Sequence, residues 1–295
     1  MRTLYSVFIY LLTPLVLAFL ALRGLRSPDY ARRWGERFAR FDAPEKTGGI
    51  MVHAVSMGEV NAASDLVREL ARRYPDLPLC LTTFTPTGSD RVRALFGDSV
   101  FHVYAPFDLP GAVRRFYDRV QPRLVIVMET EIWLNLYHEA ADRDIPLLIA
   151  NARISDRSFG RYLRLKRFTS KALEQVTEIG ARGEQDAHRL DALGANRENL
   201  QVSGNLNFEN RLPASMIEQA ETIRLAWGTH RPVFIAGSTH EAEEQPVLAA
   251  FNGVLKKYPH ALLVLVPRHP ERFGRAAQLA RASGLRVAKR SSGLA

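Results

Sequence analysis

The stretch that decides the fold class begins with Ile50-Met-Val-His-Ala-Val55 and continues through Ser56-Met-Gly-Glu59 into an amphipathic segment that ends near Arg73. The first run is apolar almost throughout, as in a strand that is buried on both faces. In the segment that follows, apolar side chains recur every three or four positions, which predicts a helix with one buried face. A buried strand leading into such a helix is the building unit of a parallel α/β sheet.

The same strand-then-helix unit repeats along the chain. Near-continuous apolar strands separated by amphipathic helices predict a parallel sheet with both faces covered. The strand candidates up to residue 210 are Ile50–Val55, Leu79–Thr83, Val100–Tyr104, Leu124–Met128, Pro146–Ala150, Thr177–Ala181 and Leu200–Ser203. We therefore predict a Rossmann-like domain over residues 23–210.

The pattern restarts further along the chain. Residues 211–228 are predicted to form a linker with a short helix, and further strand candidates follow at Val233–Ala236, Leu262–Val266 and Leu285–Ala288. We therefore predict that residues 229–295 form the start of a second Rossmann-like domain. This stretch has only 67 residues, fewer than most domains. Three strands would also leave an exposed apolar sheet edge, so we expect the second domain to be truncated.

The N-terminus carries a candidate membrane-anchor helix, residues 1–22. Leu4–Leu22 has 19 residues and no charge. As a helix it would span about 28 Å, close to the thickness of bilayer hydrocarbon. The rival interpretation is a cleaved signal peptide. Only Arg2 precedes the apolar run, whereas six arginines follow between Arg23 and Arg40, which favours an uncleaved anchor and a cytoplasmic body. Whether the helix spans the bilayer or lies in one leaflet stays open.

The charge composition indicates an anionic partner. Forty basic and 31 acidic residues give a net charge of +9, and a second basic block, Arg157–Lys171, has six cations and no acid. Such blocks suit nucleic acid, anionic lipid headgroups or phosphorylated substrates, or are solvated surface. No recognised nucleic-acid-binding motif accompanies them, so we predict an anionic membrane surface as partner and no nucleic acid. The single cysteine, Cys80, lies in an apolar run, which predicts a buried thiol in a reducing compartment.

Candidate site residues follow the predicted strands, where ligands bind in parallel α/β sheets. Spacing alone favours a plainer explanation for each of them. Capping boxes at helix N-termini match two pairs, Ser56 with Glu59 and Ser238 with Glu241. Glu129 and Glu131 match first-turn acids that a helix dipole favours. The acidic pair Asp142 and Asp144 precedes a strand instead of following one, so we interpret it as surface and predict no metal site.

Five segments, taken in order, carry a resemblance to a known family. They are His53-Ala-Val-Ser-Met-Gly-Glu59, Glu129-Thr-Glu-Ile-Trp133, Asn151-Ala-Arg-Ile-Ser155, Ala236-Gly-Ser-Thr-His-Glu241 and Pro267-Arg-His-Pro-Glu-Arg-Phe273. From the anchor to residue 295, the chain resembles 3-deoxy-D-manno-octulosonic acid (Kdo) transferases. The resemblance implies a GT-B type glycosyltransferase with two Rossmann-like domains facing a cleft, at the cytoplasmic face of the cell inner membrane. It also implies CMP-Kdo as donor, a lipid A precursor (lipid IVA) as acceptor in lipopolysaccharide biosynthesis, inversion at the anomeric carbon, and no metal or cofactor.

The same resemblance implies roles for individual residues. Glu59 matches the general base of the family, and Glu129 matches a position that stabilises the transition state. Pro267 and Arg268 match a contact to the cytidine nucleotide, and the turn at Ser238 would offer backbone N–H groups to the same ligand.

Three departures from the family pattern bear on activity. Asn207 occupies a catalytic position where the family typically has Lys, so stabilisation of the charge between sugar and phosphate is expected to be weaker. Leu134 replaces a usual Pro after Trp133. The family also continues past residue 295, so weak donor binding and no detectable transfer are expected of this chain.

Two alternatives stay open at this point. One is another two-domain glycosyltransferase that uses a different nucleotide sugar. The other is an inactive membrane-bound lipid-binding fragment, which Asn207 and the short second domain favour. Binding of CMP separates the last of these from an enzyme, because an enzyme must bind its donor and a lipid-binding fragment need not.

Overall fold

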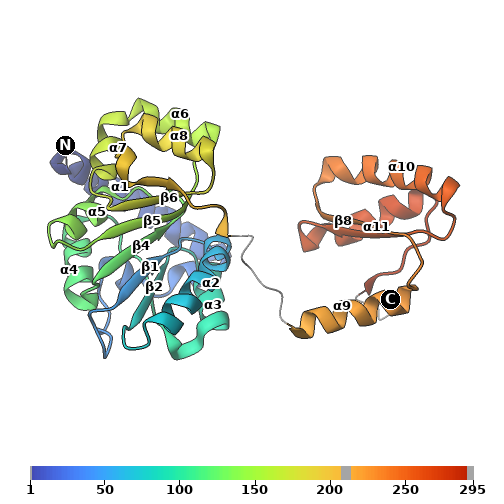
Figure 1. The fold of residues 1–295 in the computed structure, drawn as a ribbon, viewed down its shortest axis with the longest axis horizontal. Coiled ribbons are helices and arrows are strands. Elements are labelled where there is room, and N and C mark those ends of the chain that lie inside the picture. Colours follow the sequence, from blue (N-terminus) through green and yellow to red (C-terminus); the bar gives the residue numbers. More distant parts are fainter. Residues whose placement is uncertain (1, 207–213, 291–295) are drawn as a thin grey trace. The chain divides into compact units, whose positions relative to one another are not determined.

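The computed structural model describes residues 2–206 and 214–290. Its contacts fall into two compact units, Met1–Asn210 and Arg211–Ala295 (Figure 1). The first unit is built on a seven-stranded, fully parallel sheet. Its strands are β1 (Ile50–His53), β2 (Leu79–Thr83), β3 (Phe101–Tyr104), β4 (Leu124–Met128), β5 (Leu147–Ala152), β6 (Glu178–Ala181) and β7 (Leu200–Val202).

The strands lie in the order β3-β2-β1-β4-β5-β6-β7, so the chain changes direction across the sheet between β1 and β4. At this centre Ile50 of β1 lies opposite Leu79 of β2 and Leu124 of β4. The predicted parallel α/β class and all seven strand candidates of this unit are confirmed, with ends displaced by no more than two residues.

Helices cover both faces of this sheet (Figure 1). They are α2 (Met57–Arg73) and α3 (Pro86–Phe96) on one face, and α4 (Pro110–Val120), α5 (Leu134–Ala141), α6 (Asp156–Arg164), α7 (Lys166–Leu173) and α8 (Glu184–Leu193) on the other. Neighbouring strand residues point to opposite faces. On β1, Met51 therefore packs with the α4–α8 side and Val52 with the α2–α3 side. Two buried faces explain why these strands are apolar without alternation.

The apolar N-terminal segment forms one helix, α1 (Arg2–Arg26), which is longer than the predicted anchor. Residues Arg2–Leu25 form a helix long and apolar enough to cross a membrane, and an 18-residue window within it has a mean hydropathy of 2.2. One side of α1 packs on the first unit, where Leu20 is buried in a cluster with Phe107 and Leu109. The short helical turns Pro28–Ala31 and Trp34–Phe38 follow it.

The second unit contains two parallel strands among its described residues. Its elements are α9 (Ala214–Trp227), β8 (Val233–Thr239), α10 (Glu241–Lys257), β9 (Leu262–Pro267) and α11 (Phe273–Ala282). The predicted strand Leu285–Ala288 is wrong. The N–H of Leu285 bonds the carbonyl of Ala280 and closes the end of α11, after Gly284 has turned the backbone with φ 80°. Because its N–H closes the helix end, Leu285 does not pair with β8 or β9 as a strand residue would.

Candidate active site

The two glutamates predicted to be catalytic lie beyond the carboxyl ends of neighbouring strands. Glu59 is in the first turn of α2, three residues into the helix that follows β1. Glu129 directly follows Met128, the last residue of β4. β1 and β4 meet where the strand order reverses, which is the place where open α/β sheets bind their ligands. The structure therefore brings Glu59 and Glu129 together.

Glu59 is a buried side chain, 8% exposed, with two hydrogen bonds. Its Oε2 accepts the backbone N–H of Val55 at 2.8 Å, and its Oε1 accepts the hydroxyl of Ser56 at 3.1 Å. Ser56 is the N-cap residue of α2, but its hydroxyl accepts no helical N–H. The predicted capping box is therefore wrong. The hydroxyl of Ser56 donates to the Glu59 carboxylate, and that carboxylate accepts the N–H of Val55, the residue before the N-cap.

Burial raises the pKa of Glu59 to about 7. The hydrogen bond from Val55 opposes this rise, while the negative charges of Glu131 and Glu129 add to it. Near neutral pH, such a group is divided between acid and carboxylate. A carboxyl group with a pKa near the working pH is suited to accept a proton from a reacting hydroxyl.

Glu129 and Glu131 lie in a loop and not in the first turn of a helix. α5 begins only at Leu134, so the prediction that a helix dipole favours these acids is wrong. Glu129 has φ 56°, in the left-handed region, which costs a residue with a Cβ atom about 1–2 kcal/mol. Its N–H donates to the carbonyl of Ala150 at 2.9 Å, which ties the loop to β5. Backbone strain held in place by such contacts gathers at functional sites.

Glu131 makes the site a group of three acids. The Nε1–H of Trp133 donates to its Oε2 at 3.0 Å, and burial raises the pKa of Glu131. The charge of Glu131 raises the pKa of Glu59 more than that of Glu129 does. Sequence analysis gave Glu131 no part in the chemistry. The signals were its place two residues after Glu129 and its position inside the family segment Glu129-Thr-Glu-Ile-Trp133.

Aromatic rings pack beside the loop that carries these acids. The ring centroid of Trp133 lies 5.6 Å from that of Phe84 and 6.5 Å from that of His53. His53 is buried, and burial lowers its pKa to about 4. Its Nδ1 lies 2.8 Å from Oγ1 of Thr82. A neutral, packed imidazole of this kind supports the site and is not placed to exchange protons near neutral pH.

Asn151 is a site residue to which the sequence assigned no role, although it opens one of the five segments. It is 1% exposed and has φ 55°. Its Oδ1 accepts the N–H of Leu206 at 3.2 Å, and its Nδ2 has no hydrogen-bond partner among the described residues. The bond to Leu206 holds the chain directly before Asn207. Asn207, predicted to be catalytic, itself lies outside the described residues.

In the second unit, the three residues predicted to bind nucleotide lie at the carboxyl ends of β8 and β9. Pro267, the last residue of β9, is paired with Thr239 of β8. The N–H of Arg268 donates to the carbonyl of Thr239 at 2.9 Å. Ser238, the residue before Thr239, has φ 58°, in the left-handed region, where the strand register shifts.

The predicted capping box of Ser238 with Glu241 is wrong. β8 continues to Thr239, so the N-cap of α10 is His240. Its partner is Glu243, whose Oε2 accepts the N–H of His240 at 2.7 Å. Ser238 is therefore a strand-end residue and not a cap.

Arg272 has a structural role that sequence analysis did not identify. Its Nη2 lies 2.9 Å from Oε2 of Glu244, and its Nη1 lies 3.2 Å from Oε2 of Glu241. Glu244 is 0% exposed, so its carboxylate depends on this guanidinium for a balancing charge. The pair ties the segment after β9 to α10.

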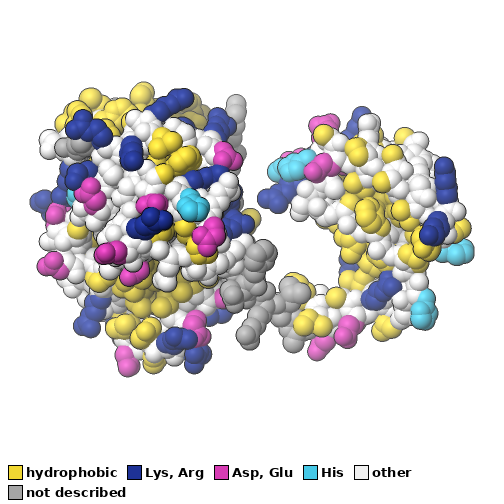
Figure 2. All heavy atoms as spheres, turned by 45° about the horizontal axis from the view of Figure 1, so that its top comes forward, with side chains coloured by type: hydrophobic (Ala, Val, Ile, Leu, Met, Phe, Trp, Pro, Cys, Tyr) yellow, Lys and Arg dark blue, Asp and Glu magenta, His cyan; other side chains and the backbone are white. Residues whose placement is uncertain are grey.

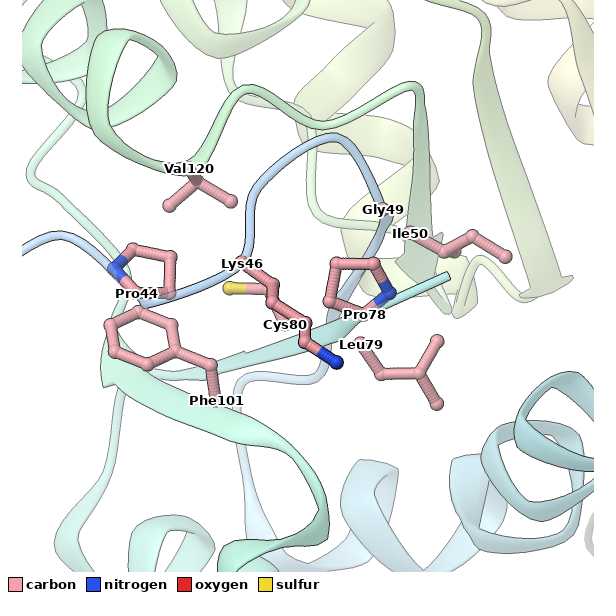
Figure 3. Close-up of a pocket in the computed structure, with 9 residues that line it drawn as sticks. All are labelled: Pro44, Lys46, Gly49, Ile50, Pro78, Leu79, Cys80, Phe101 and Val120. Carbon is pink, nitrogen blue, oxygen red and sulfur yellow. The ribbon is translucent and has the colours of Figure 1, made fainter. Parts of the chain in front are cut away.

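The cavity shown in Figure 3 is not part of the site, because it lies at the amino ends of the strands. Its lining includes Ile50, Leu79 and Phe101, at the starts of β1, β2 and β3. Its volume of about 10 Å³ is room for about one water molecule. Cys80 also lines it, and burial raises the pKa of that thiol to about 12. The prediction of a buried cysteine is confirmed.

Comparison with solved structures supports the fold alone. A UDP-GlcNAc 2-epimerase from Neisseria meningitidis matches with a TM-score of 0.59 and 14% identity, over 79% of this chain and 69% of that one. A glycosyltransferase from Rickettsia africae matches with a TM-score of 0.53 and 13% identity, over 82% of this chain and 66% of that one. These proteins share the two-unit α/β class predicted from the sequence.

Sequence comparison identifies the family. Residues 32–210 match the family described as 3-deoxy-D-manno-octulosonic-acid transferase (kdotransferase). A 3-deoxy-D-manno-octulosonic acid transferase of Haemophilus influenzae is 42% identical over 293 residues, which are 99% of this chain and 69% of that protein. Another from Bordetella pertussis is 34% identical over 308 residues, covering 99% of this chain and 70% of that protein. The chain therefore belongs to the Kdo transferase family of glycosyltransferases.

Proposed function

We propose that this protein transfers Kdo from CMP-Kdo to the lipid A precursor lipid IVA in lipopolysaccharide biosynthesis, with inversion at the anomeric carbon. The observation that carries the proposal is Glu59. A buried carboxyl group with a pKa of about 7 lies at the reversal point of the sheet, in a chain of the Kdo transferase family. The Haemophilus influenzae relative is a 3-deoxy-D-manno-octulosonic acid transferase, which supports Kdo as the transferred sugar.

In the proposed reaction Glu59 is the general base. A primary hydroxyl of the acceptor attacks the anomeric carbon of Kdo, and the Glu59 carboxylate takes its proton. The bond between that carbon and the phosphate oxygen breaks, and CMP leaves with the electron pair. A base positioned in this way accelerates a reaction by about 10²–10⁴-fold. The burial that raises the pKa of Glu59 also makes the carboxylate a stronger proton acceptor.

Glu129 is proposed to stabilise the transition state. Positive charge develops at the anomeric carbon as its bond to the phosphate breaks, and a fixed carboxylate favours that charge. The strained backbone of Glu129 and its bond to Ala150 would fix the carboxylate before substrate arrives. Asn207 is proposed to stabilise the negative charge on the leaving phosphate. An amide stabilises that charge less than an ammonium group does, so Asn207→Lys should increase the rate.

The second unit is proposed to bind the nucleotide of CMP-Kdo. The guanidinium of Arg268 would pair with the phosphate, with Pro267 against the cytidine. The left-handed turn at Ser238 would present backbone N–H groups to the same anion. We accordingly assign the acceptor to residues 23–210 and the donor to residues 229–295, with residues 211–228 as linker. The anchor, residues 1–22, would hold the enzyme at the cytoplasmic face of the cell inner membrane, against its anionic surface.

The test is a transfer assay with radiolabelled CMP-Kdo and lipid IVA. It is run on this chain and on a chimera in which residues 1–295 replace the matching part of the Haemophilus influenzae relative. From the chimera we expect labelled lipid from CMP-Kdo and none from other nucleotide sugars. Glu59→Gln should lose transfer, whereas Glu69→Gln, an exposed change on the same helix, should keep it. Transfer from another donor, or full transfer by Glu59→Gln, would contradict the proposal.

A further inference from the structure

Polar contacts fix the first two turns of α1 to the body of the first unit. The hydroxyl of Tyr5 donates to Oδ2 of Asp108 at 2.8 Å, and the hydroxyl of Ser6 donates to Oδ1 of Asn135 at 3.1 Å. Both partners are buried, Asp108 at 2% and Asn135 at 0% exposed. Asp108 also accepts the N–H groups of Asn135 and Leu136, at the start of α5. The start of α1 is therefore part of the folded unit, because these buried groups depend on one another.

The far end of α1 is held by the same unit. Leu20, 15 residues after Tyr5, is 6% exposed and packs in a cluster with Phe107 and Leu109. With its 25 residues, α1 is about 37 Å long. A helix that crosses a bilayer has its ends on opposite sides of about 30 Å of hydrocarbon. A folded body on one side of the membrane could not hold both Tyr5 and Leu20 of such a helix.

The side of α1 that faces away from the unit is apolar and exposed. Its side chains recur every three or four positions, as on one face of a helix. Those 59–73% exposed are Leu4, Phe8, Leu11, Leu15, Phe19 and Leu22. A continuous apolar stripe of this length marks an interaction surface.

The charged side chains near this stripe indicate which kind of partner covers it. α1 contains Arg2, Arg23 and Arg26 and no acid. α6 and α7, on the sheet face that also carries α5, present a second surface in which Leu163 and Leu165 are 41% and 57% exposed. The cations around these two leucines are all exposed: Arg157, Arg161, Arg164, Lys166 and Arg167. Figure 2 shows hydrophobic and basic side chains sharing the upper rim of the larger unit. Apolar side chains beside exposed cations fit the headgroup boundary of an anionic bilayer.

We propose that α1 lies in the plane of the membrane, with its exposed stripe in one leaflet of an anionic lipid bilayer, and does not cross it. The first unit then rests on the membrane along the whole length of α1. An acceptor embedded in the same leaflet would reach the protein without leaving the lipid.

Cysteine labelling on sealed membrane vesicles distinguishes this arrangement from a spanning helix. Thr3→Cys and Ser27→Cys mark the two ends of α1, and Ser99→Cys marks the body; all three positions are exposed, whereas the native Cys80 is buried. A membrane-impermeant maleimide is added to right-side-out and to inside-out vesicles. We expect all three cysteines to react from the same side. Labelling of Thr3→Cys from the opposite side, or from neither side, would overturn the proposal, and sugar transfer plays no part in the readout.

Vesicle flotation of the purified full chain tests the lipid surface. We expect binding to vesicles of phosphatidylcholine with phosphatidylglycerol, and weaker binding to phosphatidylcholine alone. Changing Leu11, Leu15 and Phe19 together to Ser should weaken binding roughly a hundredfold or more, since each apolar side chain leaves the lipid. The matched variant Leu11→Ile, Leu15→Ile and Phe19→Leu should keep it, and circular dichroism should report the same fold for both. Unchanged binding by the serine variant, or equal binding to both vesicles, would overturn the proposal.

Discussion

The exchange of Glu59 for Gln is expected to raise stability while it removes activity. Gln keeps an oxygen that can accept the N–H of Val55, and its amide can donate to the hydroxyl of Ser56, so both hydrogen-bonding positions stay occupied. What disappears is the ionisation of a buried carboxyl group. The pKa of Glu59 rises from 4.5 to about 7, and such a rise corresponds to roughly 3 kcal/mol.

The sign of the pH dependence follows from that rise. A carboxyl group with a higher pKa in the folded than in the unfolded chain binds its proton more tightly when folded. Its stabilising contribution is complete below pH 4.5 and is lost as the pH rises through about 7. Glu59→Gln has no such loss. At pH 8 the variant should be more stable than the wild type by about 2 kcal/mol, after about 1 kcal/mol is allowed for the altered hydrogen bonds. At pH 4.5 it should be equal or slightly less stable.

Denaturant unfolding of the first unit at several pH values measures this difference, and the transfer assay measures activity in parallel. In the chimera, transfer by Glu59→Gln should fall about 10²–10⁴-fold. A loss of stability at pH 8 that accompanies the loss of activity would refute the reasoning, because it would mean that the carboxylate holds the loop together. A stability gain at pH 8 with unchanged transfer would instead refute the assignment of Glu59 as base.

Three further outcomes are expected. Burial lowers the pKa of His53 from 6.5 to about 4, so the stability that its neutral ring contributes is present above pH 6.5 and is lost as the pH falls toward 4. This loss is up to roughly 3 kcal/mol, and acid unfolding curves of His53→Gln should not show it. Arg272→Met leaves the buried carboxylate of Glu244 without this guanidinium and should lower the unfolding free energy of the second unit, measured by hydrogen exchange of α10. No change would mean that the pair is not formed. Limited proteolysis should remove Arg211–Ala295 before it cuts Met1–Asn210, because a two-stranded sheet holds few buried contacts; equal resistance of the two units would contradict this.

The sequence alone determined the fold class, because burial on both sheet faces leaves a local record. Ile50–Val55 is apolar without alternation, and the segment after it has helical spacing, so strand, helix and parallel pairing could all be predicted. The same pattern placed Glu59 and Glu129 after strands, and therefore at one edge of the sheet. The same criterion gave a wrong strand prediction at Leu285–Ala288, because a short apolar run becomes a strand only where a neighbouring strand pairs with it.

Only the tertiary structure decided what the polar residues do. A Ser-x-x-Glu spacing is the same in a capping box and in a catalytic turn; burial and the bonds from Val55 and Ser56 separate the two at Glu59. Glu131 belongs to the site because the fold places its charge close enough to Glu59 to raise the pKa of that carboxyl group. The orientation of α1 depends likewise on Tyr5 and Asp108, which are 103 residues apart in the sequence. The ionisation of a carboxyl group and the docking of a helix depend on neighbours that come from distant parts of the chain, and such neighbours leave no local pattern to read.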